Sequence, residues 1–215
     1  MAINASNESA GRNFTSVPTG THVMRCYRMI EIGTVTGDFK GKPISQPKVW
    51  LDWELPNEQK EFKEGEGLKP FSIGKEFTLS LNEKAKLRMF LEGWRGKAFT
   101  EEEAKEFDIT KLVGIPCLGS IVEEKKNEKT YSNLTSVSTL IKGMECPKQV
   151  NPSFILSYDS FDFDLFNKLP NFLKEKMEKT PEFKKIADKY HEVEFERSKA
   201  HVTDEINNPD NDLPF

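Results

Sequence analysis

The clearest pattern in the sequence is an alternation of apolar and polar positions between Pro47 and Leu55. One face of an extended chain receives the apolar residues Val49, Leu51, Trp53 and Leu55, and the other receives Lys48, Trp50, Asp52 and Glu54. Such alternation predicts a β-strand with one side in a core and the other toward solvent.

Weaker β-prone runs lie on either side of this strand. His22–Ile32 and Phe71–Leu79 predict two further strands, with a turn-rich loop at Gly33–Gly41 and a charged linker at Asn57–Lys69. Later in the chain, Val113–Glu123 and Thr130–Ser138 predict a hairpin across Glu124–Lys129.

Helical signals separate the third and fourth predicted strands. Ser80 and Glu83 have capping-box spacing, and Leu87, Phe90, Leu91 and Trp94 follow at helical intervals until Gly93 and Gly96 close the helix. Lys84, Lys86 and Arg88 are then free to face solvent or phosphate. Thr100–Glu103 predicts a second short helix by the same capping device.

Three strands, a helical insertion and two strands is the order of the OB-fold, a small, partly open barrel that often binds oligonucleotides. We therefore predict a mainly β fold with an OB-fold domain at residues 20–143, after a flexible N-terminal arm at 1–19. Lysine- and glutamate-rich helical patterns at Phe161–Glu178 and Pro181–Ser198 predict a helical extension over 144–199, with Pro170 at the start of a helix or breaking it. Residues 200–215 are predicted to be a disordered acidic tail.

The net charge of −4 argues at first against nucleic-acid binding, but the distribution of the charge along the chain weakens that argument. Residues 203–215 contain four acidic side chains and no lysine or arginine, which leaves 31 basic and 31 acidic residues in the rest of the chain. A basic groove on the body is therefore compatible with the composition.

Neither a metal site nor a disulfide framework is expected. Cys26, Cys117 and Cys146 are odd in number and widely spaced, and His22, His191 and His201 have no ligand spacing relative to them. No apolar run approaches the ~20 residues of a membrane span, and no signal peptide is evident, so we expect a soluble, cytoplasmic protein without a cofactor.

Single-strand binding needs aromatic faces for bases and cations for phosphates. Trp50 is the first candidate ring because it lies on the polar face of its strand; the alternative is that it packs under the insertion or the N-terminal arm. Tyr27, Phe39 and Tyr131 are further candidates that could equally be core, and Trp53 and Trp94 are expected in the core. The candidate phosphate contacts are Arg25, Arg28, Lys40, Lys42, Lys48, Lys75, Lys125, Lys126 and Lys129.

Lys40 and Lys42 fall in the loop between predicted strands one and two, and Lys125, Lys126 and Lys129 in the loop between four and five. These two loops flank the binding face of an OB barrel. The alternative for any one of these side chains is a solvated surface lysine.

The sequence closes on an acidic segment with an apolar end, Asp210-Asn-Asp212-Leu213-Pro214-Phe215. A terminal ring and carboxylate, with acidic residues upstream to steer them toward a basic partner, are typical of a short linear motif. We expect Asp210, Asp212, Leu213, Pro214 and Phe215 to bind a protein partner, and residues added after Phe215 to block that binding.

Two resemblances support these expectations. The ending D-N-D-L-P-F resembles the acidic tip of bacterial single-stranded DNA-binding proteins, which enters a pocket on helicases, nucleases and polymerase subunits. The body, through segments such as 49–56, 77–88, 93–103 and 107–118, is similar to a phage-encoded family of single-stranded DNA-binding proteins. This resemblance implies an OB-fold, sequence-tolerant single-strand binding in phage replication or recombination, and a location in the bacterial host cell.

Other classes fit less well. Asp164 with Glu182 and Lys184 has the letters of a nuclease metal site, but Thr180-Pro181 indicates a helix start where that site needs a buried strand. No phosphate-binding loop of the GxxxxGK[ST] type and no catalytic triad is present, so we expect no enzyme. The remaining alternative is an adaptor or inhibitor that does not bind DNA and uses the tail to occupy pockets on host replication or repair proteins.

Overall fold

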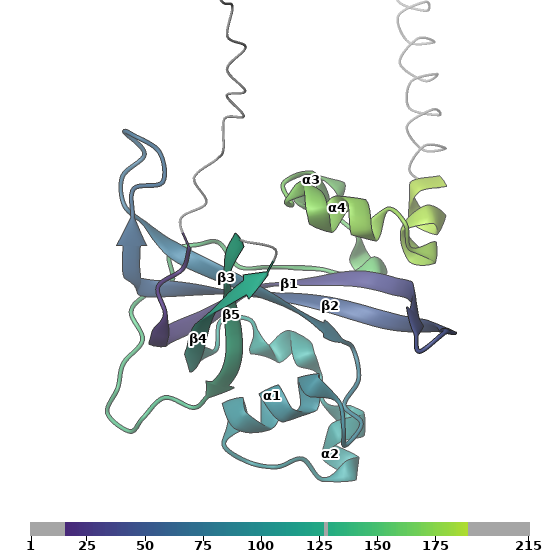
Figure 1. The fold of residues 1–215 in the computed structure, drawn as a ribbon, viewed down its shortest axis with the longest axis horizontal. Helices are drawn as coiled ribbons and strands as arrows, with labels where there is room; N and C mark the ends of the chain where they lie inside the picture. Colours follow the sequence, from purple (N-terminus) through teal and green to yellow (C-terminus); the bar gives the residue numbers. More distant parts are fainter. Residues whose placement is uncertain (1–15, 127–128, 189–215) are drawn as a thin grey trace, which may run out of the picture.

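The computed structural model describes residues 16–126 and 129–188. This part of the chain is mainly β, with one sheet in the order β3-β2-β1-β4-β5 and a sixth strand paired with β1 (Figure 1). The strands are β1 (Gly20–Phe39), β2 (Lys42–Lys60), β3 (Lys69–Thr78), β4 (Pro116–Lys126), β5 (Lys129–Ser138) and β6 (Phe154–Leu156). The five predicted strands and their order are confirmed; β6, which runs parallel to β1, was not predicted.

β1 and β2 form one long hairpin, and the predicted loop at Gly33–Gly41 is wrong. The strand continues to Phe39, and the turn contains only Lys40 and Gly41, with φ of 54° and 77°. Asp38 accepts a hydrogen bond from the backbone nitrogen of Gly41 at 2.7 Å. Two consecutive left-handed residues form the tight turn that matches the twist of a hairpin, so the strands can pair to their ends.

The insertion between β3 and β4 consists of α1 (Lys86–Arg95), α2 (Glu101–Glu106) and the short 3-10 helix η1 (Ile109–Leu112). The predicted capping box at Ser80 is wrong, because Ser80 accepts from Asn82 in a local turn and the N-cap of α1 is Ala85, five residues after the predicted cap. The box at Thr100 is confirmed, with both reciprocal hydrogen bonds to Glu103. Gly96 ends α1 in the left-handed conformation.

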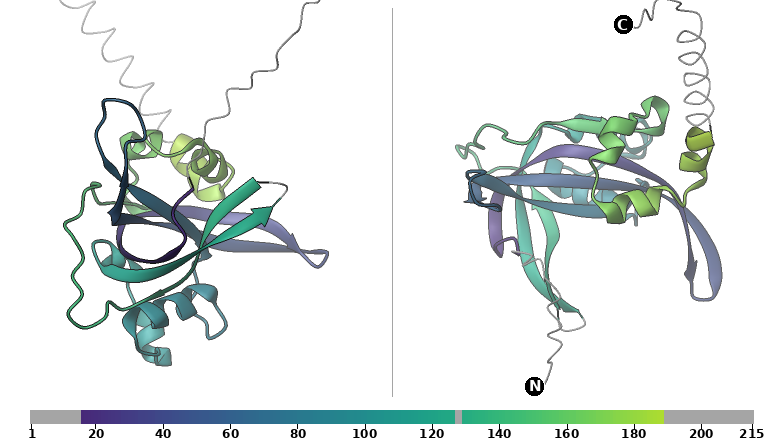
Figure 2. Two further views of the ribbon diagram at one scale, coloured as in Figure 1. Left: turned by 60° about the vertical axis from the view of Figure 1, so that its left-hand side comes forward. Right: turned by 90° about the horizontal axis from the view of Figure 1, so that it is seen from above.

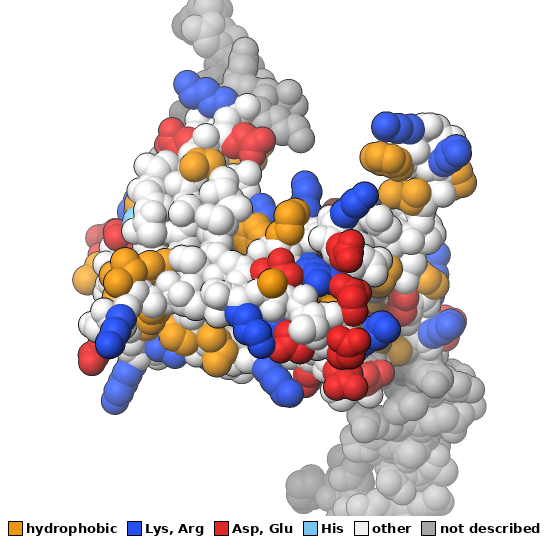
Figure 3. All heavy atoms as spheres, turned by 90° about the horizontal axis from the view of Figure 1, so that it is seen from below, with side chains coloured by type: hydrophobic (Ala, Val, Ile, Leu, Met, Phe, Trp, Pro, Cys, Tyr) orange, Lys and Arg blue, Asp and Glu red, His pale blue; other side chains and the backbone are white. Residues whose placement is uncertain are grey.

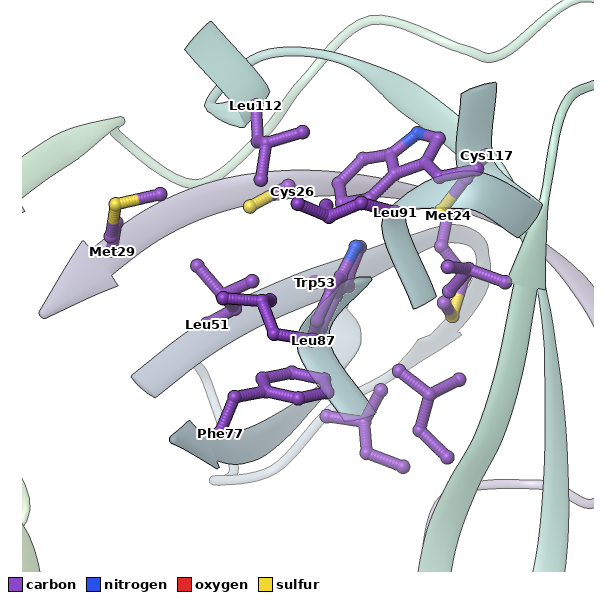
Figure 4. Packing of buried hydrophobic residues seen from close by; sticks show 14 of the residues in the cluster. Met24, Cys26, Met29, Leu51, Trp53, Phe77, Leu87, Leu91, Leu112 and Cys117 are labelled. Carbon is purple, nitrogen blue, oxygen red and sulfur yellow. The ribbon is translucent and has the colours of Figure 1, made fainter. Parts of the chain in front are cut away.

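α1 packs on the concave side of the sheet and closes the first hydrophobic core (Figure 4). Trp53 has no exposed surface, and its ring centroid lies 5.8 Å from that of Trp94 on α1. The predicted inward face of β2 is confirmed, since Val49, Leu51 and Leu55 are also buried.

The C-terminal extension is shorter in its helices than predicted. The 3-10 helix η2 (Tyr158–Ser160) precedes α3 (Phe163–Asn167) and α4 (Asn171–Met177), and residues 181–188 are again helical. Pro170 is the N-cap of α4 and separates the two helices, as predicted. The remainder of the predicted helix over Pro181–Ser198 lies outside the described residues.

This extension packs against the convex side of β1 and β2, away from α1 and α2 (Figure 2). Ile30 and Ile32 of β1 form a second core there with Leu156, Leu173 and other apolar residues. Gly33 permits the close approach, because a Cβ at this position would come within 2.9 Å of side-chain atoms of Thr180 and Glu182.

The prediction that the polar face of β2 meets solvent is therefore wrong. Asp52 is 5 % exposed and Glu54 is fully buried. Glu54 accepts hydrogen bonds from the backbone nitrogens of Val150 and Asn151, and Asp52 pairs with Arg28. Polar side chains that a later segment covers and hydrogen-bonds have the same alternating sequence pattern as polar side chains in solvent.

The sheet is not closed into a barrel in the described ranges, because no backbone pairing joins β3 to β5. The edges of β3 and β5 face each other in a seam that side chains bridge. There Lys75 Nζ on β3 donates to Asn133 Oδ1 on β5 at 3.0 Å.

Candidate nucleic-acid interface

The tip of the β1–β2 hairpin carries one exposed ring and two lysines. Phe39 is 61 % exposed, and the ammonium group of Lys40 lies 5.5 Å from the centroid of its ring. Lys42, the backbone partner of Phe39, is also exposed. The tight turn between them holds the aromatic and cationic side chains together at the end of the paired β1 and β2 strands.

The β4–β5 hairpin also carries an exposed ring and an exposed lysine, although the cross-strand partner of Tyr131 is Glu124. Tyr131 is 51 % exposed, and Lys125 on the facing strand is exposed as well. Lys126 and Lys129 are backbone partners next to the tip, and their side chains are outside the described part of the structure. Glu123 and Glu124 are exposed on the same hairpin, so its charge is mixed.

The two hairpins project to the same side of the sheet, which is toward the viewer in Figure 1 and downward in the right panel of Figure 2. Figure 3 shows a hollow between the two projections, with lysine or arginine side chains on both and hydrophobic side chains on the floor between them. This combination of a concave surface, exposed rings and cations has the features that a single strand requires.

The seam between β3 and β5 adds two more lysines. Lys75 Nζ lies 5.5 Å from the ring centroid of Phe90 on α1. Its partial burial and the positive charge of Lys86 lower the pKa of Lys75. Because Lys75 makes its hydrogen bond to a neutral amide oxygen, an anion bound here would stabilise its charge.

Trp50 is not an open ring on a solvated face. It is half-buried, and its ring centroid lies 5.2 Å from that of Phe172 on α4, with the planes at 66°. The element that packs on Trp50 is the C-terminal extension and not the insertion, while residues 1–15 of the N-terminal arm lie outside the described residues. Lys48, on the same strand face, donates to Gln46 Oε1 at 3.1 Å and Thr78 Oγ1 at 2.8 Å.

For Tyr27 the structure shows the alternative interpretation, a core residue, and its neighbours Arg25 and Arg28 make hydrogen bonds within the fold. Tyr27 is 7 % exposed, and burial together with the Asp52 charge raises its pKa to about 12. Arg25 donates to the carbonyl oxygens of Gly114 and Pro147 at 2.8 and 3.1 Å. Arg28 forms an ion pair with Asp52. The ring of Tyr27 is buried and offers no open face for a base to stack on.

Sequence reasoning missed Phe172. Phe172 is 53 % exposed, although it neighbours the fully buried Leu173. The available signal was the helix start at Pro170, because with Leu173 and Met177 pointing inward Phe172 falls on the outer side of α4.

The residues that match a nuclease motif in the sequence, Asp164, Glu182 and Lys184, do not form a metal site in the described structure. Glu182 accepts from the backbone nitrogen and hydroxyl of Thr34 at 2.9 and 2.6 Å, and so anchors the extension to β1. Among the described residues no cluster of histidine, cysteine, aspartate and glutamate has the geometry of a metal site. The predicted partner-binding residues Asp210, Asp212, Leu213, Pro214 and Phe215 lie outside the described residues.

Comparisons with protein-family models, with curated proteins and with solved structures find no match to this chain. Within residues 16–126 and 129–188, no helix is both long enough and apolar enough to cross a membrane.

Proposed function

We propose that the chain binds single-stranded DNA without strong sequence preference, in the hollow between the β1–β2 and β4–β5 hairpins. The observation that carries the proposal is the exposed ring and lysine on each of two hairpins that project to one side of the sheet, Phe39 with Lys40 and Tyr131 with Lys125. Rings stack on unpaired bases, and lysines follow the phosphates, so both requirements are met on one surface.

The topology supports the same proposal. The strand order and the helical insertion between β3 and β4 are those of an OB-fold, in which the loops after strands one and four flank the ligand. We propose that this sheet is an OB-fold whose convex face is covered by the C-terminal extension. The single-stranded DNA would then lie nearer to the hairpin tips and to the β3–β5 seam than to the buried part of β2.

The experiment is an anisotropy titration of fluorescently labelled oligo-dT at several salt concentrations. We expect binding at low salt, with a log–log slope of about −0.7 for each phosphate contacted. Replacing Lys40 and Lys42 together by glutamine should weaken binding and flatten that slope. Lys63→Gln is the control, since Lys63 is exposed in the β2–β3 loop, away from both hairpins.

If the chain does not bind oligo-dT even at low salt, the adaptor hypothesis, in which only the tail binds a partner, would be favoured.

For the tail itself, we propose that residues 210–215 recruit replication proteins. Deleting residues 204–215 removes four acidic side chains. This truncation should tighten DNA binding and abolish co-purification of replication proteins with the chain; unchanged DNA affinity would leave only the recruiting role.

A further inference from the structure

The C-terminal extension brings an exposed aromatic ring over β2. Phe172 on α4 contacts Trp50 edge-on and is itself more than half exposed. Lys176, one helical turn later, forms an ion pair with Glu76, which is the backbone partner of Trp50 on β3. Phe172 is therefore held in place by its helix and by the indole, while part of its surface remains open to solvent.

Trp50 is a fixed support for that ring. A side chain at Gly74 would come within 2.2 Å of Trp50 Cζ2, so the indole lies directly against the backbone of β3. The Nε1 hydrogen of Trp50 is buried and has no acceptor in the described part of the chain.

Lys48 has no carboxylate partner among the described residues. Lys48 lies two residues before Trp50 on the same face of β2, and both of its hydrogen-bond acceptors are neutral oxygens. Its charge is thus stabilised by dipoles only, and a phosphate group would be a stronger partner.

We propose that Phe172, supported by Trp50, is a stacking site for one base of a single strand, and that Lys48 contacts the phosphate of that nucleotide. This inference rests on the proposed function and adds to it a site on the C-terminal extension, outside the two hairpins. Because Trp50 fixes the orientation of Phe172, little side-chain freedom is lost when a base stacks on it.

The test compares three proteins in the oligo-dT titration: the full chain, Phe172→Ala and Phe62→Ala. Phe62 is a matched control, since it is 47 % exposed and lies edge-on to Phe71 with the ring centroids 5.1 Å apart. We expect Phe172→Ala to weaken binding at least about fivefold and Phe62→Ala to leave it unchanged. Lys48→Gln should reduce the salt slope by about 0.7. Photo-crosslinking with 5-iodouracil in the oligonucleotide should label the peptide that contains Phe172.

The outcomes separate the two proposals. If the full chain does not bind oligo-dT, the proposed function fails. If it binds while Phe172→Ala binds equally well or more tightly, and the crosslink lies elsewhere, Phe172 is a surface ring or a cover, and this inference is overturned. If thermal melting shows that Phe172→Ala is unfolded, Phe172→Leu replaces it, because leucine keeps the apolar contact with Trp50 but has no aromatic face, and the same loss is expected.

Discussion

The buried carboxylate of Glu54 holds Asn151 by two hydrogen bonds, from the backbone nitrogen and from Nδ2, each 2.8 Å from Oε2. The backbone nitrogen of Val150 donates to the same carboxylate at 3.0 Å. A side chain of β2 therefore fixes the segment that leads into the C-terminal extension. The extension is attached to the sheet by polar anchors as well as by its apolar core.

Glu54→Ala should remove this anchor and lower the free energy of unfolding by about 3 kcal/mol, because several buried donors lose their acceptor together. Urea denaturation followed by tryptophan fluorescence measures the change. Glu83→Ala is the control, since Glu83 is exposed on the loop before α1 and should change stability little. Equal stability of the two variants would show that the hydrogen bonds of Glu54 contribute nothing net.

Gly74→Ala should disturb the packing of Trp50. The added Cβ would stand 2.2 Å from Trp50 Cζ2 and 2.4 Å from Asp52 Oδ1, so both side chains must move. Overpacking of this kind costs about 1–3 kcal/mol. Gly37→Ala is the matched control, because Gly37 also lies in a strand and its Cβ would meet nothing within 4 Å. A Gly74→Ala protein as stable as Gly37→Ala would contradict the close contact.

The strands could be predicted from the sequence because the pattern that forms them is local. Val49, Leu51 and Leu55 are buried where the alternation places them, and the capping box at Thr100 forms with both of its hydrogen bonds. The order of strands and helices then follows directly, and with it the β4–β5 hairpin that carries Tyr131, whereas the end of the β1–β2 hairpin that carries Phe39 was expected to be a loop.

The covered face of β2 could not be predicted, because the residues that cover Glu54 and Trp50 belong to the C-terminal extension, far along the chain. Asp52 and Glu54 are acidic, and nothing local distinguishes a buried acid with partners from a solvated one. Arg88 was also expected to face solvent or phosphate, but it is buried with acceptors that are close in the sequence. It is 6 % exposed and donates to Glu92, Glu101 and the carbonyl oxygen of Phe99. Trp50 was misjudged because its cover comes from α4.

Two buried tyrosines predict how stability changes at alkaline pH. Burial raises the pKa of Tyr27 and of Tyr158 from 10 to about 12, and nearby carboxylates add to both shifts. Between pH 10 and 12 the unfolded chain has lost these protons while the folded chain retains them. Stability contributed by the neutral phenols is therefore present below pH 10 and is lost as the pH rises toward 12.

Urea midpoints measured from pH 8 to pH 11 test this dependence. Tyr158→Phe loses the hydrogen bond to the carbonyl oxygen of Ile32, so it should be less stable at pH 8, but its stability should fall less steeply above pH 10. Tyr27→Phe should show the same shallower slope. A slope as steep as that of the unaltered chain in both variants would contradict the assignment.

The hairpin rings give the most direct test of the interface. Phe39→Ala and Tyr131→Ala should each weaken oligo-dT binding by roughly 1–3 kcal/mol, because each removes one stacking face. Both rings are more than half exposed, so neither change should lower the melting temperature much. Since the rings stand on separate hairpins, the losses should add in the double variant. A loss from only one of the two single variants would mean that the DNA binds along a single hairpin. Additive losses from both would mean that the DNA crosses the hollow between the hairpins.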